Sequence, residues 1–246
     1  MQLVLLGESF AAEDIARRLL AGGHEIHLDC KDEQLLRRLC CFGRIARVAL
    51  KEALEKPHLP KVIWSADLSG RQLCALAELL PADTILLNSR AQYFEDNIRL
   101  AARLAENGAS YIDIGTVIDE YRIALFVGGE KEAFQKVEPL LATIAGDGGY
   151  YHCGPAGVGH FLRCVQQKYE VLMQSALAEV LLEIKRSPFN DGFNLEALLI
   201  FGHLFCKKQP LSDSVWHFLR TRIPSALSGN ANPVDSAAKP LHSVSN

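Results

Sequence analysis

Two side chains with the capacity for chemistry, Arg163 and Glu170, lie close together in the second half of the chain. A guanidinium stays charged at any working pH, so Arg163 could bind a phosphate or a carboxylate but would be a poor general base. Glu170 carries a carboxyl group, which can exchange a proton with a substrate. A proline-free helical pattern from about Val158 to Arg186 predicts one helix, on the order of 40 Å long, that carries both residues.

A second candidate site lies at the start of the chain. An apolar run, Gln2 to Leu6, ends at Gly7 and is followed by a helical pattern from about Ala11 to Leu20 and a second apolar run, Glu25 to Leu28. This order predicts a βαβ unit with Gly7 in its first tight turn. Dinucleotide-binding folds place G-x-G-x-x-G there, so that the backbone and the helix N-terminus can approach a pyrophosphate.

Only the first of those three glycines is present, in Gly7-Glu8-Ser9-Phe10-Ala11-Ala12. Ser9 places a Cβ and a hydroxyl where the backbone should come closest to phosphate, and Glu8 adds a charge that repels an anion. Ala12 is acceptable, because the third position also takes alanine. The turn is therefore a weak prediction of a cofactor site.

Asp29 and Lys31 follow the second strand and point to different cofactors. An acidic side chain at this distance from the glycine turn would bind the ribose hydroxyls of NAD, whereas Lys31 could meet the 2′-phosphate of NADP. Both could equally be solvated residues at a strand end.

Strand-like runs and helical stretches keep alternating after this unit, which predicts an extended parallel sheet. They are Ile45 to Val48, Lys61 to Ser65, Arg71 to Leu80 (helical) and Thr84 to Leu87, with a further helix from Phe134 to Ile144. We therefore predict an α/β fold, with a Rossmann-like dinucleotide-binding domain over 1–153. A short all-α domain led by the long helix is expected over 154–224, with helices at about 195–206 and 212–222, and a flexible tail over 225–246.

Composition excludes several classes of function. A net charge of -3 and a pI near 6.2 give no global attraction to nucleic acid or to anionic membranes, and the N-terminus lacks the charged start of a signal peptide, so a cytoplasmic location is expected. Seven cysteines without a CxxC pair argue against a disulfide framework and a zinc site, and most are expected to be reduced core residues. His152 and His160 are isolated from other ligand residues and are expected to be structural, with no metal site.

Three segments resemble the 6-phosphogluconate dehydrogenases: YIDIGT at 111–116, VGGEKEA at 127–133 and YYHCGPAGVGHF at 150–161. The resemblance covers roughly residues 1 to 205. It implies a nucleotide-binding domain joined to a helical domain, and a site on the long helix for the family's catalytic lysine, asparagine and glutamate.

The site positions depart from that family where the core positions do not. The family's lysine is Arg163 here, its asparagine is Gln167 and its neighbouring histidine is Gln166, while Glu170 is kept. The family also has an asparagine in the loop that precedes Tyr93, and Ala91 stands at that position here. The family's Ser-Gly-Gly loop is replaced by Val-Ile-Asp at 117–119.

Three functions remain open at this point. The first is a non-catalytic homologue that acts as a binding or regulatory protein, with a protein partner and as a homodimer, because few helices follow the long one to cover it. The second is an oxidoreductase with a changed substrate, in which Glu170 is the general acid, Arg163 orients an anionic group and NADP or NAD is the cofactor. The third is a module that senses a nucleotide through Gly7 and Asp29. The first and third leave room for the loss of the cofactor or of its chemistry.

Overall fold

The computed structural model describes residues 1–55, 61–118, 123–146 and 148–188. The chain forms two compact units, Met1–Leu177 and Ala178–Asn246. The helices expected at 195–206 and 212–222 and the tail expected at 225–246 lie outside the described residues. The domain boundary expected after residue 153 stays a prediction.

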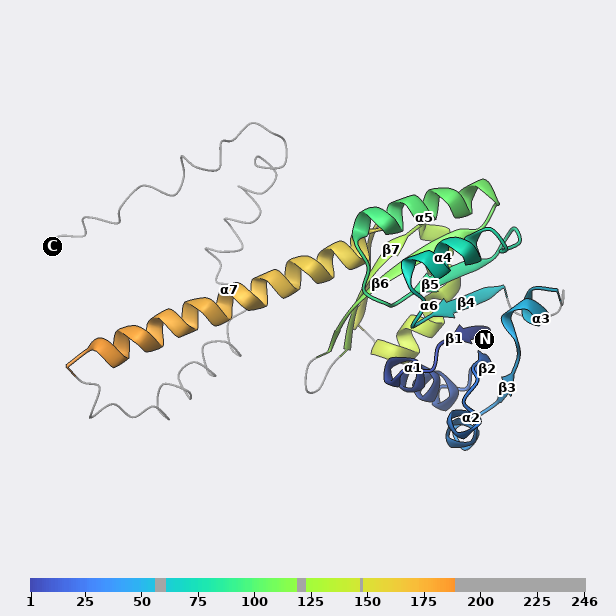
Figure 1. Cartoon of the computed structure of the whole chain (residues 1–246), viewed down its shortest axis with the longest axis horizontal. Coiled ribbons are helices and arrows are strands. Elements are labelled where there is room, and N and C mark those ends of the chain that lie inside the picture. Colours follow the sequence, from blue (N-terminus) through green and yellow to red (C-terminus); the bar gives the residue numbers. More distant parts are fainter. Residues whose placement is uncertain (56–60, 119–122, 147, 189–246) are drawn as a thin grey trace. The chain divides into compact units, whose positions relative to one another are not determined.

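The first unit is built on one sheet, in which the described residues contribute eight strands in the order β3-β2-β1-β4-β5-β6-β7-β8 (Figure 1). This is the strand order of a doubly wound α/β fold, with the reversal between β1 and β4. The strands are β1 Gln2–Leu6, β2 Glu25–Asp29, β3 Ile45–Arg47, β4 Val62–Ser65, β5 Ile85–Asn88, β6 Ser110–Ile118, β7 Ile123–Gly129 and β8 Tyr150–Gly154.

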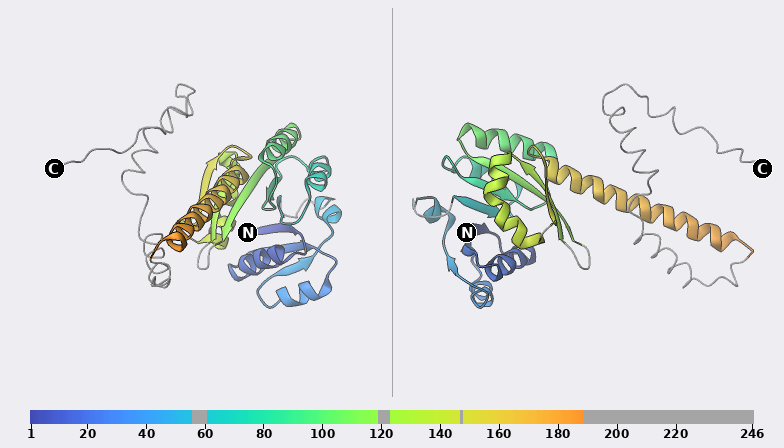
Figure 2. Two further views of the ribbon diagram at one scale, coloured as in Figure 1. Left: turned by 60° about the vertical axis from the view of Figure 1, so that its left-hand side comes forward. Right: turned by 180° about the vertical axis from the view of Figure 1, so that it is seen from behind.

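Helices cover both faces of the sheet (Figure 2). They are α1 Phe10–Ala21, α2 Glu33–Leu39, α3 Leu50–Glu55, α4 Gly70–Ala77, α5 Phe94–Glu106 and α6 Lys131–Ala145. A further helix, α7 Val158–Arg186, follows β8. Strand residues alternate between the faces: Leu3 and Leu5 pack with α1, α2 and α6, whereas Val4 and Leu6 pack with α3, α4 and α5.

The predicted parallel sheet is confirmed from β3 through β6, but β7 runs antiparallel to β6. Only residues 119–122 separate these two strands, and a parallel return needs a crossover of a dozen or more residues. The prediction of one helix from Val158 to Arg186 is confirmed by α7. Among the described residues, no helix is both long and apolar enough to cross a membrane.

The expectation that most cysteines are core residues is wrong. Of the six described cysteines, all free thiols, only Cys30 is buried and Cys153 is half-buried, while Cys40, Cys41, Cys74 and Cys164 are exposed. Burial raises the pKa of the Cys30 and Cys153 thiols. In the helices at or next to these exposed cysteines, leucines occupy buried positions. Examples are Leu35 and Leu39 of α2 and Leu73 of α4.

Candidate functional site

Three of the five predicted cofactor residues line a hollow of about 410 Å³ at the carboxyl ends of β1, β2 and β4, whereas Ser9 and Ala12 are not part of its lining. Gly7, Asp29 and Lys31 line it, together with Glu8 and Asp67. Ligands of doubly wound folds bind at this edge, at the point where the strand order reverses. Three of the residues predicted to bind a cofactor thus share one hollow, and their role there stays a prediction. Asp67 was not among the predicted residues.

The carboxylate of Asp67 accepts hydrogen bonds from the donor groups of the turn after β1. Its Oδ2 accepts hydrogen bonds from the backbone N–H groups of Glu8 and Ser9, each at 2.7 Å, and its Oδ1 accepts one from the Ser9 hydroxyl. The same hydroxyl accepts from the backbone N–H of Ala12 at 3.2 Å and caps α1. These are the groups that a helix N-terminus offers to an anion.

Gly7 makes room for that carboxylate. Its φ of 142° lies in a region that side chains rarely adopt, and a Cβ at this position would lie 2.5 Å from Oδ2 of Asp67. As the sequence suggested, the lack of a side chain at Gly7 lets another group come close to the backbone of the turn. That group is the Asp67 carboxylate of the chain itself.

Asp29 and Lys31 are engaged with neighbouring backbone. Oδ2 of Asp29 accepts a hydrogen bond from the N–H of Leu50 at 3.1 Å, at the start of α3. The N–H of Lys31 donates to the Glu8 carboxylate, which ties the turn after β1 to the end of β2. The Lys31 side chain supplies the positive charge of the lining, against the three carboxylates of Glu8, Asp29 and Asp67.

A dinucleotide does not fit this arrangement as it stands. Its pyrophosphate needs the turn's N–H groups and a helix N-terminus, and Asp67 already holds two of these groups with a charge of the same sign. The N–H groups that would face a pyrophosphate are thus occupied by Asp67.

On α7, Arg163, Gln166 and Glu170 form one side-chain network. The Arg163 guanidinium donates to Oε1 of Gln166, whose amide donates to the Glu170 carboxylate, and Arg163 Nη1 lies 3.8 Å from Oε2 of Glu170. Successive turns of one helix face carry the three residues, which is why they meet. The structure thus joins two of the predicted catalytic residues, while Gln167 is exposed and lies outside this network of hydrogen bonds.

β6 passes directly against this part of α7. A Cβ at Gly115 would lie 2.2 Å from the carbonyl oxygen of Gly159 and 2.9 Å from Cβ of Arg163. Further along β6, Val117 is half-buried and Ile118 is 72% exposed. Asp119 lies outside the described residues.

The start of α7 is fixed to the sheet by a buried carboxylate on β6. Oδ1 of Asp113 accepts from the N–H of Gly157 at 2.6 Å and Oδ2 accepts from the N–H of His160 at 2.8 Å. Asp113 is fully buried. A carboxylate at a helix N-terminus satisfies N–H groups that lack a partner within the helix and complements the helix dipole.

A chain of buried polar groups continues from His160 into α5 and β5. Asn97 Nδ2 lies 2.8 Å from Nδ1 of His160, the Tyr111 hydroxyl donates to Oδ1 of Asn97 at 2.7 Å, and Asn88 Nδ2 lies 3.1 Å from that hydroxyl. Burial lowers the pKa of His160, although Asp113 and the Ile114 carbonyl act to raise it. Burial also raises the pKa of Tyr111. The lowered pKa favours the neutral form of His160. No cluster of metal ligands occurs among the residues that the structure describes.

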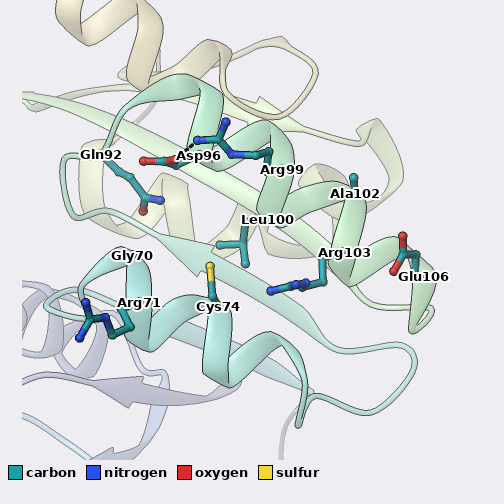
Figure 3. Close-up of a pocket in the computed structure, with 10 residues that line it drawn as sticks. All are labelled: Gly70, Arg71, Cys74, Gln92, Asp96, Arg99, Leu100, Ala102, Arg103 and Glu106. Atoms are coloured by element: carbon teal, nitrogen blue, oxygen red, sulfur yellow. Dashed lines mark hydrogen bonds and ion pairs between the residues drawn. The ribbon is translucent and has the colours of Figure 1, made fainter.

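Another hollow, of about 620 Å³, lies between α4 and α5 (Figure 3). Arg71, Arg99 and Arg103 line it with Cys74. Arg99 forms an ion pair with Asp96, and Arg103 lies 3.2 Å from Glu78. Because two of the three arginines are paired with carboxylates, this groove is a poorer candidate site for an anion.

Known proteins place the chain in a family. YqeC of Bacillus subtilis, which carries the provisional name 6-phosphogluconate dehydrogenase, is 25% identical over 200 residues, 78% of this chain and 67% of that protein. The NAD(+)-dependent, decarboxylating 6-phosphogluconate dehydrogenase of Haloferax volcanii is 24% identical over 188 residues, 73% of this chain and 62% of the relative. This chain thus matches less than two thirds of the archaeal enzyme's length.

Solved structures share the fold. The 3-hydroxyisobutyrate dehydrogenase of Mycobacterium tuberculosis, solved with L-serine, superposes with a TM-score of 0.64 at 18% identity, over 75% of this chain and 65% of that one.

Residues 14–157, more than half of the chain, match the family described as the NAD binding domain of 6-phosphogluconate dehydrogenase. The chain therefore belongs to this family.

Proposed function

We propose that this chain keeps the family's nucleotide-binding scaffold without its dehydrogenase chemistry, and that it acts as a binding or regulatory homodimer. The observation that carries the proposal is the Arg163–Gln166–Glu170 network. It occupies the part of α7 where the resemblance places the catalytic groups, and all three members are tied to one another.

The chemical reason is the missing base. A desolvated lysine can lower its pKa and take a proton from a substrate hydroxyl, but Arg163 stays protonated and only donates hydrogen bonds. The side chain of Glu170 is 48% exposed, accepts a hydrogen bond from the Gln166 amide and lies 3.8 Å from the Arg163 guanidinium. Loss of one proton-transfer partner typically slows a reaction by about 10²- to 10⁴-fold.

The proposed homodimer rests on the exposed apolar residues of α7. Val165, Tyr169 and Leu172 are 47%, 56% and 59% exposed in the single chain and recur at helical spacing on one side of the helix. Burial of this stripe against a second copy would remove it from water. A monomeric mass in light scattering at micromolar concentration would contradict the dimer.

A second candidate is an oxidoreductase that passes a hydride between a nicotinamide cofactor and a small acid other than 6-phosphogluconate. It is favoured by Glu170, which is retained, and by the Arg163 guanidinium, which would orient an anionic group of the substrate. A nucleotide sensor without turnover would use the hollow around Gly7 and Asp29 instead.

The test is a turnover assay with the full chain, 6-phosphogluconate and a panel of small hydroxy acids, each with NAD and NADP, followed by cofactor absorbance. We expect no substrate-dependent reduction. Turnover that disappears in Glu170→Gln would overturn the proposal and support the oxidoreductase. Turnover that is unchanged in Glu170→Gln would show that it does not come from this site.

A further inference from the structure

We propose that Asp67 closes the dinucleotide site from within: its carboxylate occupies the place of a cofactor phosphate, and a dinucleotide binds only when that side chain is displaced. The proposal concerns binding alone. It stands or falls independently of whether the chain turns over any substrate.

The first step is the match between the carboxylate and the donors. Asp67 engages the turn with both oxygens, Oδ2 with two backbone N–H groups and Oδ1 with the Ser9 hydroxyl. Two adjacent N–H groups and a hydroxyl at the start of a helix are an anion-binding arrangement. The carboxylate therefore uses the donors that a bound phosphate would need.

The second step is that the chain holds Asp67 there from both sides. The backbone N–H of Ala66, one residue before it, donates to the Leu6 carbonyl at 3.0 Å, which continues the β1–β4 pairing. Two residues after it, Ser69 caps α4 in a capping box with Gln72. Arg90 donates a hydrogen bond to the carbonyl oxygen of Asp67 itself. With the backbone fixed in this way, a rotation of the Asp67 side chain is enough to open the site.

The third step is electrostatic. A pyrophosphate that enters must break the hydrogen bonds of an ionised acceptor and then lie beside Glu8, Asp29 and the displaced Asp67, with one lysine, Lys31, in the lining. Hydrogen bonds to charged groups are the stronger ones, and like charges repel at this range. We expect the closed state to weaken dinucleotide binding by about tenfold to a hundredfold.

The position of Asp67 also predicts which ligands it affects. The carboxylate lies on the phosphate donors, so it competes with any ligand that carries phosphate there, such as ADP, NADH or NADPH. Adenosine has no phosphate and does not need the N–H groups of Glu8 and Ser9. Its affinity should therefore be insensitive to Asp67.

The experiment titrates the full-length chain with NADH and NADPH by nicotinamide fluorescence, and with ADP and adenosine by calorimetry. Asp67→Ala removes the carboxylate, Asp67→Asn keeps its shape without the charge, and Asp96→Asn is a matched control at an exposed, paired aspartate. We expect ADP and at least one dinucleotide to bind at least tenfold more tightly to Asp67→Ala than to the wild type. Asp67→Asn should gain at least threefold, while Asp96→Asn and the adenosine titrations should stay within twofold of the wild type.

Several outcomes would overturn the proposal. They are dissociation constants for NADH, NADPH and ADP within twofold between Asp67→Ala and the wild type, no binding by either up to millimolar ligand, and an equal gain for adenosine. Far-ultraviolet circular dichroism verifies that each variant is folded, and if Asp67→Ala is not, Asp67→Asn decides. Turnover of a substrate would refute the proposed function without bearing on Asp67.

Discussion

Asp113 offers the sharpest test of how α7 is joined to the sheet. It is fully buried, accepts the N–H groups of Gly157 and His160, and belongs to β6. Little space surrounds it: a Cβ at Gly128 would lie 2.4 Å from Oδ1, and one at Gly159 would lie 2.9 Å from Oδ2. A substitution therefore leaves the donors without an acceptor.

The magnitude follows from those two donors. Each buried N–H group that loses its partner costs about 1–3 kcal/mol. Asp113→Ala leaves both N–H groups without an acceptor, so we expect the free energy of unfolding to fall by about 2–6 kcal/mol. Asp113→Asn keeps one acceptor and turns an amide toward the other N–H group, for an expected loss of about 1–3 kcal/mol. Either is a large share of the 5–15 kcal/mol that is typical of a domain.

The assay is urea unfolding of both variants, followed by circular dichroism and by the fluorescence of the buried Trp64. Asp96→Asn is the control, because Asp96 is a surface residue paired with Arg99 and its loss should change stability by less than about 1 kcal/mol. If Asp113→Ala unfolded at the same urea concentration as Asp96→Asn, the reasoning that Asp113 anchors α7 would be refuted.

Three further perturbations test other parts of the fold. The folded state holds His160 with a lowered pKa, so the unfolded chain binds its proton first as the pH falls below about 6.5, and stability should drop there by up to about 1.4 kcal/mol per pH unit. In His160→Gln, the urea midpoint should change less with pH below about 6.5 than in the wild type. An unchanged slope would show that His160 is not the cause of the pH dependence. Gly159→Ala would place a Cβ 2.5 Å from the Phe126 carbonyl oxygen and should lower the melting temperature by several degrees. Gly23→Ala is the control: its Cβ would meet nothing within 4 Å, but φ is positive, so this variant reports the backbone strain alone. Ser69→Ala removes the cap of α4 and should lower the free energy of unfolding by about 1 kcal/mol, with Ser69→Thr as the control that keeps a hydroxyl.

Much of the fold could be predicted because its signals are local. The apolar run before Gly7, the helical period after it and the run ending at Leu28 placed β1, α1 and β2 within a residue or so of their observed bounds. The long proline-free stretch placed α7 correctly. The antiparallel direction of β7 was not predicted, although the four residues between β6 and β7 are too few for a parallel return.

The contents of the site were harder to predict, because they depend on residues far apart in the chain. Asp67 meets Ser9 across a separation of 58 residues, and nothing in the local pattern marks it. One signal was available: β4 lies beside β1, so a carboxylate shortly after β4 must reach the same edge of the sheet as Gly7. The buried pairing of Asn97 with His160 has no comparable signal, since both residues lie in helices whose packing follows only from the whole fold.

The hydrogen bonds of Asp67 also bear on how this fold persists without a ligand. A protein that depends on a cofactor gains stability by mass action and loses it when the cofactor is scarce, leaving empty binding groups behind. Here the chain satisfies those groups itself. The folded population should therefore be insensitive to the cellular supply of nicotinamide, and a lineage carrying such a side chain could let its cofactor chemistry decay without exposing the protein to unfolding and degradation.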